Sequence, residues 1–194
     1  MSVDRPVVAP PRLTTDRFEL RLPDESDVPQ ILAYREENAD YFEPFEPLQP
    51  SDHLTEAYWQ RKVESDRGDF EAGQAVRMVL FEPGPAGAAF GIVAFSQIIR
   101  GPLQSCFLGY ALAEKRQGAG LMTEAVRMGI DYMFAEMNLH RISANYLPHN
   151  TPSAALLKRL GFTVEGYARD YVRIEGRWQD HILTTLLNPD WIPE

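Results

Sequence analysis

Alternation of polar and apolar residues opens the regular part of the chain. Residues 16–22, DRFELRL, alternate as a strand with one buried face does. The residues that follow carry Val28, Ile31 and Leu32 at helical spacing, and Asp24 precedes them in the position of a helix cap. The pattern therefore predicts a strand and then a capped helix at the start of the domain.

The middle of the chain reads as a loop, a helix and a three-stranded meander. Residues 41–50, YFEPFEPLQP, hold three prolines and three aromatic residues and are expected to form an ordered loop. Residues 51–70 have the pattern of a capped helix. Turns rich in proline and glycine at 83–87 and 101–102 then separate three strand-like runs, which predicts antiparallel pairing. These runs are 74–82, 89–100 and 103–113.

A long amphipathic helix is predicted after the meander. Apolar residues recur at i, i+3, i+4 and i+7 spacing over residues 119–137, which is typical of a helix that packs one face on a sheet. Residues 140–147, HRISANYL, then predict another strand. The apolar positions of the helix are Met122, Ala125, Val126, Gly129 and Met133.

The C-terminal part adds a short helix and a strand pair. Residues 151–161 predict a helix with Thr151 as its cap and Gly161 as its terminator. Residues 162–187 predict two strands joined by a turn at 175–176. Together the segments predict an α+β fold in which helices cover the faces of a central mixed sheet.

The composition fits one globular domain. The chain has 194 residues, of which 44% are hydrophobic and 24% charged, enough for a substantial core. No apolar run approaches the roughly 20 residues that a membrane span needs, and the first residues lack the pattern of a secretion signal, so we expect a cytoplasmic protein. Cys106 is the single cysteine and no Cys/His cluster has metal-ligand spacing, so neither a disulfide nor a metal site is expected.

The net charge of −9 bears on the partners of the protein. An acidic protein repels the phosphate backbone of nucleic acids and attracts basic partners, although an acidic total is also common among soluble proteins. We therefore expect no direct contact with nucleic acid and no membrane partner, and either a monomer or a homodimer.

Residues 114–120, EKRQGAG, suggest a ligand on local grounds, because they join a predicted strand to a predicted helix. Free N–H groups at a helix N-terminus and the positive end of its dipole favour an anion such as phosphate. Gly118 and Gly120 let the backbone approach closely, and Lys115 or Arg116 can add positive charge. The loop lacks the Gly-Lys-Ser/Thr of a P-loop and the third glycine of a dinucleotide fingerprint. A tight turn with solvated basic residues is the alternative.

Two segments in the same order resemble a known family. KRQGAGL, at 115–121, resembles the pyrophosphate-binding signature of the GNAT acyltransferase superfamily, although Lys115 stands where Gln or Arg is usual. NTPSAALLKRLGFTVEG, at 150–166, resembles its second signature. Longer segments, including HRISANYLPHN and EGYARDYVRIEGRWQDHILTTLLNPDW, resemble the branch that acetylates the N-terminal alanine of a ribosomal protein. The likeness covers most of residues 12–192, which we expect to be one N-acetyltransferase domain with 1–11 as an N-terminal extension.

The resemblance implies a GNAT fold, in which a central mixed, mostly antiparallel sheet has a splayed parallel strand pair and helices on both faces. It also implies acetyl-CoA as the co-substrate, with its pantetheine arm paired along Tyr110, Ala111, Leu112 and Ala113 like an added strand. The backbone N–H of Leu112 would then stabilise the oxyanion of the reacting thioester. The pyrophosphate would lie on Arg116, Gln117, Gly118, Ala119, Gly120 and Leu121.

The second signature bears on two further roles. Asn150 matches the asparagine that contacts pantetheine or a nearby backbone amide in the family, and shaping the entry to the following helix is its alternative role. Many members use a tyrosine to protonate the departing thiolate, but Leu157 stands at that position. Ser153 is the substitute that related ribosomal-protein acetyltransferases suggest, and its alternative is a hydroxyl that only satisfies a backbone amide.

A general base is harder to assign from the sequence. Counting along EGYARDYVRIEG places Val172 where the resemblance leads us to expect a carboxylate. Asp170 is the favoured candidate, with Glu165 and His149 as others. Each has a structural alternative: Asp170 can pair with a neighbouring arginine, Glu165 can brace the strand, and His149 can lie on a loop surface. An N-terminal α-amine, whose pKa lies near 8, could also react without a strong base.

The acceptor side is expected in the less regular segments. Tyr41, Phe42 and Phe45 with Glu43 and Glu46 could hold the start of a basic polypeptide, although packing in the core is the more common role for such aromatic residues. Near the last hairpin the same two roles apply to Tyr171 and Trp178.

These observations predict an enzyme that transfers an acetyl group from acetyl-CoA to the N-terminal amine of a ribosomal or other basic protein. Direct attack in a ternary complex is expected, because Cys106 lies within an apolar strand without a histidine beside it, which disfavours an acyl-enzyme. Two alternatives stay open. One is acetylation of a free small amine such as an antibiotic, a polyamine or an amino acid, and the other is a non-catalytic CoA-responsive binding module.

Overall fold

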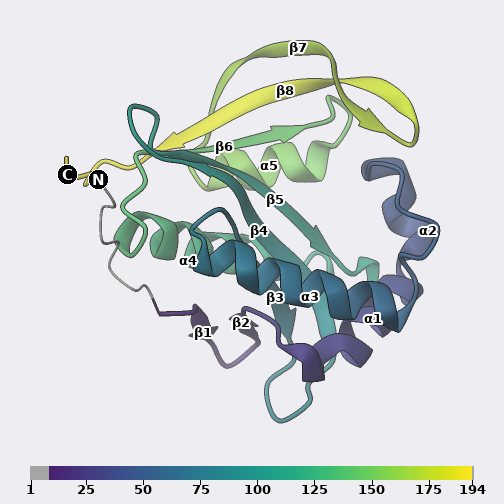
Figure 1. Cartoon of the computed structure of the whole chain (residues 1–194). Helices are drawn as coiled ribbons and strands as arrows, with labels where there is room; N and C mark the ends of the chain where they lie inside the picture. The colour runs from purple at the N-terminus through teal and green to yellow at the C-terminus, as the bar shows by residue number, and fades with distance from the viewer. Residues whose placement is uncertain (1–8, 194) are drawn as a thin grey trace.

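An eight-stranded sheet forms the centre of the protein (Figure 1). The structure is a computed structural model and describes residues 9–193, so residues 1–8 of the predicted N-terminal extension lie outside it. Among the described strands β5 and β6 run parallel and the other neighbours run antiparallel, which confirms the predicted mixed, mostly antiparallel sheet. In sheet order the strands are β1 (Arg12–Thr14), β2 (Glu19–Arg21), β3 (Val76–Phe81), β4 (Ala89–Ile99), β5 (Ser105–Leu112), β6 (Arg141–Tyr146), β8 (Arg177–Leu187) and β7 (Thr163–Ile174).

Helices cover both faces of this sheet, as predicted. α4 packs against β4 and β5 so closely that a Cβ atom on Gly129 would lie 2.8 Å from the ring of the fully buried Phe95. α1 and α3 lie on the opposite face and contact β4 and β3. No helix within residues 9–193 is both long and apolar enough to cross a membrane. The helices are α1 (Val28–Glu37), α2 (Ala39–Phe42), α3 (Glu56–Glu71), α4 (Leu121–Ala135) and α5 (Thr151–Arg159), with short 3-10 helices at η1 (Glu25–Asp27), η2 (Glu43–Phe45) and η3 (Glu114–Arg116).

The N-terminal segments have the predicted types of secondary structure, but some of them begin or end at other residues than predicted. Asp24 does cap the first helical turn, since its side chain accepts a hydrogen bond from the backbone N–H of Ser26 at 2.9 Å. The predicted loop over 41–50 is wrong in part, because its first residues end α2 and form η2. Pro44 lies in the first turn of η2. Proline is tolerated there because the backbone N–H that it lacks would have no partner within the helix.

Two helix starts also differ from the prediction. α4 begins at Leu121 rather than near Ala119, because Gly118 and Gly120 have φ angles of +79° and +76° that interrupt the helix. α5 is capped by Asn150 and not by Thr151, since the Asn150 side chain accepts the Ser153 backbone N–H at 3.1 Å.

The last two strands form a long hairpin that reaches across the molecule. Its turn lies at Glu175 and Gly176, as predicted, and both residues have positive φ. In Figure 1 the hairpin of β7 and β8 extends beyond α5 toward α2. The Glu175 backbone N–H donates to the carbonyl oxygen of Glu46 at 3.1 Å, so the hairpin tip is joined to the segment that follows η2.

Candidate active site

A cavity of about 930 Å³ opens where β5 and β6 separate. The two strands pair only as far as Leu108 with Ala144, although β5 continues to Leu112 and β6 to Tyr146. This confirms the splayed parallel pair. Because the strands part while both still run in the sheet, the gap between them connects the two faces.

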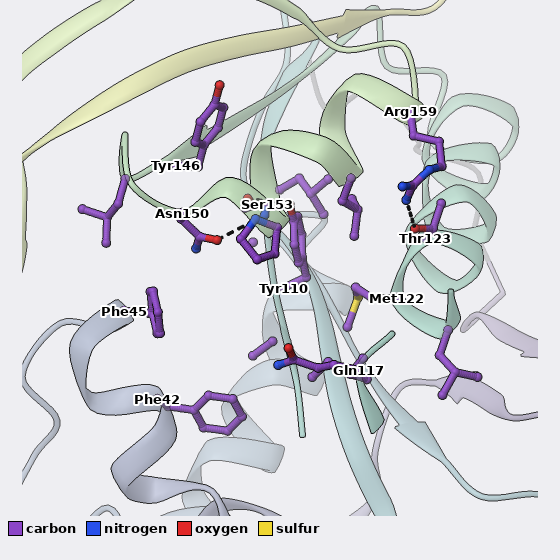
Figure 2. Close-up of a pocket in the computed structure, with 18 of the residues that line it drawn as sticks. Phe42, Phe45, Tyr110, Gln117, Met122, Thr123, Tyr146, Asn150, Ser153 and Arg159 are labelled. Carbon is purple, nitrogen blue, oxygen red and sulfur yellow. Dashed lines mark hydrogen bonds between the residues drawn. The ribbon is translucent and has the colours of Figure 1, made fainter. Parts of the chain in front are cut away.

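Side chains from distant parts of the chain form opposite walls of this cavity. Figure 2 shows Asn150 and Ser153 at the start of α5 on one side and Phe42 and Phe45, from α2 and η2, on the other. Tyr110 of β5 lies beside Ser153 in the same view. The donor wall below comprises α5, the edge of β5 that faces the gap and the start of α4 with residues 118–120, and the acceptor wall comprises α2 and η2.

The free edge of β5 offers backbone groups to the cavity. The Ala113 N–H donates to the Phe90 carbonyl of β4 at 2.9 Å, and backbone groups alternate in direction along a strand. Ala111 therefore also bonds toward β4, whereas Tyr110 and Leu112 direct their N–H and C=O groups into the gap. The predicted pairing of the pantetheine arm with four consecutive residues is thus limited to two of them, Tyr110 and Leu112. Among residues 9–193 the Leu112 N–H has no acceptor, as the predicted oxyanion role requires.

The glycine loop presents a row of free backbone donors. From Gly118 to Thr123 no backbone N–H has an acceptor among residues 9–193, because the first bond of the helix runs from the Glu124 N–H to the Gly120 carbonyl. A Cβ atom on Gly118 or Gly120 would meet nothing within 4 Å, so these glycines are required by their positive φ and not by crowding. The loop from Glu114 to Gly120 is exposed, and it fits a pyrophosphate group.

The arginines that line the cavity near this loop differ from the basic residues that the sequence suggested. Arg116 forms an ion pair with Glu82, and its guanidinium lies over the Phe90 ring, outside the lining of the cavity. Arg127 of α4 and Arg159 of α5 line the cavity instead, and Arg159 donates to the Thr123 hydroxyl at 3.2 Å (Figure 2).

Arg17 supports the same loop from β2's N-terminal side. Its guanidinium donates to the Ala119 carbonyl at 3.0 Å and pairs with Glu124.

Ala119 and the buried Ala113 do not line the cavity, whereas Gln117 and Leu121 do. The groups positioned to bind an anion are therefore the backbone of the glycine loop and the side chains of Arg127 and Arg159.

The start of α5 brings two hydroxyl groups together. The Ser153 Oγ lies 2.8 Å from the phenolic oxygen of Tyr110, and either oxygen can be the donor. Burial raises the pKa of Tyr110 to about 12, while the hydrogen bond with Ser153 opposes this effect. The phenol therefore keeps its proton at neutral pH. Asn150 caps the helix with its Oδ1 and also lines the cavity, so its structural role is observed and its predicted ligand contact stays a prediction.

Two positions behave as the sequence suggested. Leu157 is 1% exposed and belongs to the core, so the site of the usual tyrosine lies in apolar packing. Cys106 is fully buried, and burial raises the pKa of its thiol to about 12. A thiol with so high a pKa is a poor nucleophile at neutral pH, which argues against an acyl-enzyme.

The three candidate bases differ in their position relative to the cavity. Asp170, the favoured candidate, is exposed outside the cavity, on a bulged part of β7. Its position therefore does not support a role as base. Glu165 pairs with Arg141 at 2.8 Å and accepts from the Thr185 hydroxyl, so it braces the strands. His149 lines the cavity from an exposed loop.

The acceptor wall contains most of the aromatic and acidic residues that we expected there. Tyr41, Phe42, Phe45 and Glu46 line the cavity, and Glu43 does not. Phe42 is also buried in the core at 4% exposure, which confirms its predicted packing role, while its contact with the acceptor stays a prediction. Of the two hairpin residues, Trp178 is 61% exposed and does not line the cavity. Tyr171 does not line it either, because other side chains lie between them.

Some lining residues were missed in the sequence. Thr123 and Arg127 follow Gly120 at helical spacing and could have been found from that pattern. His181 is buried, lines the cavity and lies in β8, where no motif marks it. The side chain of Tyr110 was also overlooked, because only its backbone was considered.

Comparisons with known proteins agree with this geometry. Residues 17–163 match the family described as acetyltransferase (GNAT) domain. The [ribosomal protein uS5]-alanine N-acetyltransferase of Escherichia coli (strain K12) is 42% identical over 182 residues, covering 94% of this chain and 93% of that protein.

Two solved structures have the same fold. The ribosomal-protein-S5-alanine acetyltransferase of Vibrio fischeri has a TM-score of 0.90 at 35% identity, over 94% of this chain and 100% of that one. RimJ of Mycobacterium smegmatis, in complex with CoA-disulfide, has a TM-score of 0.83 at 29% identity, over 96% and 89%. The family match over most of the chain, the free loop donors and the splayed strands together identify the chain as a member of the GNAT acetyltransferase family.

Proposed function

We propose that this acetyltransferase uses acetyl-CoA to acetylate the N-terminal α-amine of a ribosomal or similarly basic protein, with alanine as the first residue. The observation that carries the proposal is the gap between β5 and β6, which joins a donor wall with free backbone N–H groups to an acceptor wall of aromatic residues. The relative from Escherichia coli, named for acetylating alanine of ribosomal protein uS5, supports this acceptor class.

The donor wall has the groups that acetyl-CoA requires. Acetyl-CoA brings an activated thioester carbonyl to the site. The exposed edge of β5 offers the N–H and C=O groups of Tyr110 and Leu112 to an amide-bearing chain, as a neighbouring strand would. The free N–H groups from Gly118 to Thr123 and the side chains of Arg127 and Arg159 meet its phosphates.

The chemistry then follows from the residues at the gap. The Leu112 N–H hydrogen-bonds to the carbonyl oxygen on which negative charge develops. Ser153, hydrogen-bonded to Tyr110, provides the proton for the departing sulfur. The amine attacks directly in a ternary complex, because the buried Cys106 offers no thiolate to form an acyl-enzyme.

The test is acceptor-dependent release of CoA by the wild-type protein, with mass spectrometry of the products. One peptide begins with alanine and continues with basic residues, and its matched control has the same sequence with a blocked N-terminus. We expect acetylation of the free α-amine in the first peptide and no reaction in the second.

Two other results would overturn the proposal. Rapid acetylation of polyamines, aminoglycosides or amino acids with no reaction of the peptide would assign the free-amine activity instead. Binding of acetyl-CoA in calorimetry without turnover of any amine would identify a binding module. Incubation with a ribosomal fraction and mapping of new N-terminal acetyl groups would then name the acceptor.

A further inference from the structure

We propose that His181 is the base that takes the proton from the acceptor ammonium, an inference that rests on the acetyl transfer proposed above. His181 is 6% exposed, lies in β8 and lines the cavity. It is neither of the two carboxylates nor the loop histidine that the sequence suggested.

The hydrogen bonding of His181 defines which ring nitrogen is free. Its Nδ1 lies 3.0 Å from the carbonyl oxygen of Gln179. A carbonyl oxygen can only accept, so this contact assigns the proton to Nδ1 and leaves a lone pair on Nε2. Nε2 has no hydrogen-bond partner among residues 9–193. With Nδ1 held against its own strand, Nε2 lies at the far end of the ring, where it can accept a proton.

The ring of His181 is also held in place from the neighbouring strand. The ring of Tyr171 in β7 lies against it with a centroid distance of 5.7 Å. The Tyr171 hydroxyl in turn accepts from the Asn145 side chain of β6 at 3.3 Å. These contacts orient the imidazole next to the end of β6, where the gap begins.

The sheet register places His181 on the face opposite Tyr110. Leu108 pairs with Ala144 across the parallel strands, so Tyr110, two residues beyond Leu108, shares the face of Ala144. Asn145 therefore lies on the other face, and it pairs with Leu183 of β8. His181, two residues from Leu183, lies on that same other face. A base on one face and the Tyr110–Ser153 pair on the other bracket the gap from both sides.

The remaining titratable groups of the cavity are less suitable. Its two carboxylates are engaged, since Glu46 binds Arg35 through both oxygens at 2.9 and 2.5 Å and Glu124 pairs with Arg17. His149 lies on an exposed loop, and no hydrogen bond to residues 9–193 orients its ring. His181 is thus the imidazole of the cavity whose free lone pair is held in a fixed orientation.

The proton balance is complete without a further reactant. The ammonium gives one proton to Nε2, and the freed nitrogen lone pair forms the C–N bond as the C–S bond breaks. The second proton of the nitrogen replaces the one that Ser153 gives to the sulfur. The proton on His181 then leaves to solvent, so one proton is released for each amide formed.

The test compares His181→Asn with His53→Asn, because the Nδ1 of His53 also contacts a backbone carbonyl, that of Pro50 at 2.8 Å, and His53 does not line the cavity. An asparagine amide can keep the bond to the Gln179 carbonyl but has no basic nitrogen, so the fold should be preserved in circular dichroism and the affinity for acetyl-CoA unchanged in calorimetry. We expect kcat/KM for the alanine peptide to fall by about 100-fold or more in His181→Asn. It should change by less than about 3-fold in His53→Asn. In His181→Ala, added imidazole should restore part of the lost rate.

A second measurement does not depend on turnover. Nitrogen NMR of imidazole-labelled protein, with the His181 signals identified by their loss in His181→Asn, should report the proton on Nδ1 in the neutral ring. A proton on Nε2, or a His181→Asn variant as active as wild type, would overturn the inference and leave the proposed function intact. A wild-type protein without activity toward any amine would overturn both.

Discussion

The hydroxyl oxygens of Tyr110 and Ser153 lie 2.8 Å apart and join β5 to α5 on the donor wall. Tyr110 lies in the strand that precedes the first signature and Ser153 lies in the second, and each hydroxyl orders the other. Their contact supplies an O–H group at the cavity even though Leu157 occupies the position where the family resemblance led us to expect a tyrosine. Two predictions concern this pair.

Ser153→Ala and Tyr110→Phe should each lower kcat, by roughly 10- to 100-fold, because both remove part of the path by which the sulfur gains its proton. The double variant should be little worse than the worse single one, since the residues act as a unit. Calorimetry should find acetyl-CoA affinity nearly unchanged. Losses that multiply in the double variant would show that the two hydroxyls act independently.

The same pair makes a prediction about pH. Burial raises the pKa of Tyr110 to about 12, so its phenol stays protonated in both the folded and the unfolded chain below about pH 9. The ratio of wild-type to Tyr110→Phe activity should therefore be constant from about pH 6 to about pH 9. Stability against urea should likewise show no pH dependence from this residue in that range. A ratio that varies strongly with pH would contradict this assignment.

Gly118→Val should abolish binding of acetyl-CoA while the protein stays folded. The φ angle of +79° disfavours a branched residue, and the added side chain would occupy the open space over the free N–H groups. Gly84→Val is the matched control, because Gly84 also has positive φ and open space but lies in the turn between β3 and β4. Calorimetry should find tight binding only in the control, and equal loss in both would indicate backbone strain alone.

Two alanine substitutions within helices should shift stability in opposite directions. Gly129→Ala places a Cβ atom 2.8 Å from the buried ring of Phe95 and should cost about 1–3 kcal/mol. Gly68→Ala in α3 meets nothing within 4 Å and should add about 0.5–1 kcal/mol, because alanine is the better helix former. Urea denaturation would measure both, and a stabilising Gly129→Ala would refute the close packing of α4 on β4.

Glu46→Gln should weaken the acceptor wall. Arg35 is 7% exposed, and both carboxylate oxygens of Glu46 bind its guanidinium, so removal of the charge leaves a buried cation poorly compensated. A loss of about 2 kcal/mol is expected, which corresponds to a fall in Tm of about 4–8 °C. The exposed Glu43, in η2, gives the control Glu43→Gln, for which thermal denaturation should show almost no change.

Local sequence determined the elements that carry the donor wall. Helical periodicity predicted α4 on the sheet, and the glycines at 118 and 120 predicted a turn at its start because few other residues adopt positive φ. The order of the two signatures then predicted the family and its splayed strands. These features depend on neighbours within a few residues, so a linear pattern contains them.

Tertiary structure alone decided which side chains meet at the gap. Counting along the sequence leads to Val172 and favours Asp170 as a nearby carboxylate, but the register shifts between Ala168 and Val172, and a bulge changes the face to which later residues point. His181 enters the cavity because of the pairing of β8 with β6, and Tyr110 reaches Ser153 because α5 packs on β6, the neighbour of β5. Such contacts depend on strand register and on the point where β5 leaves β6, which no local pattern of residues encodes.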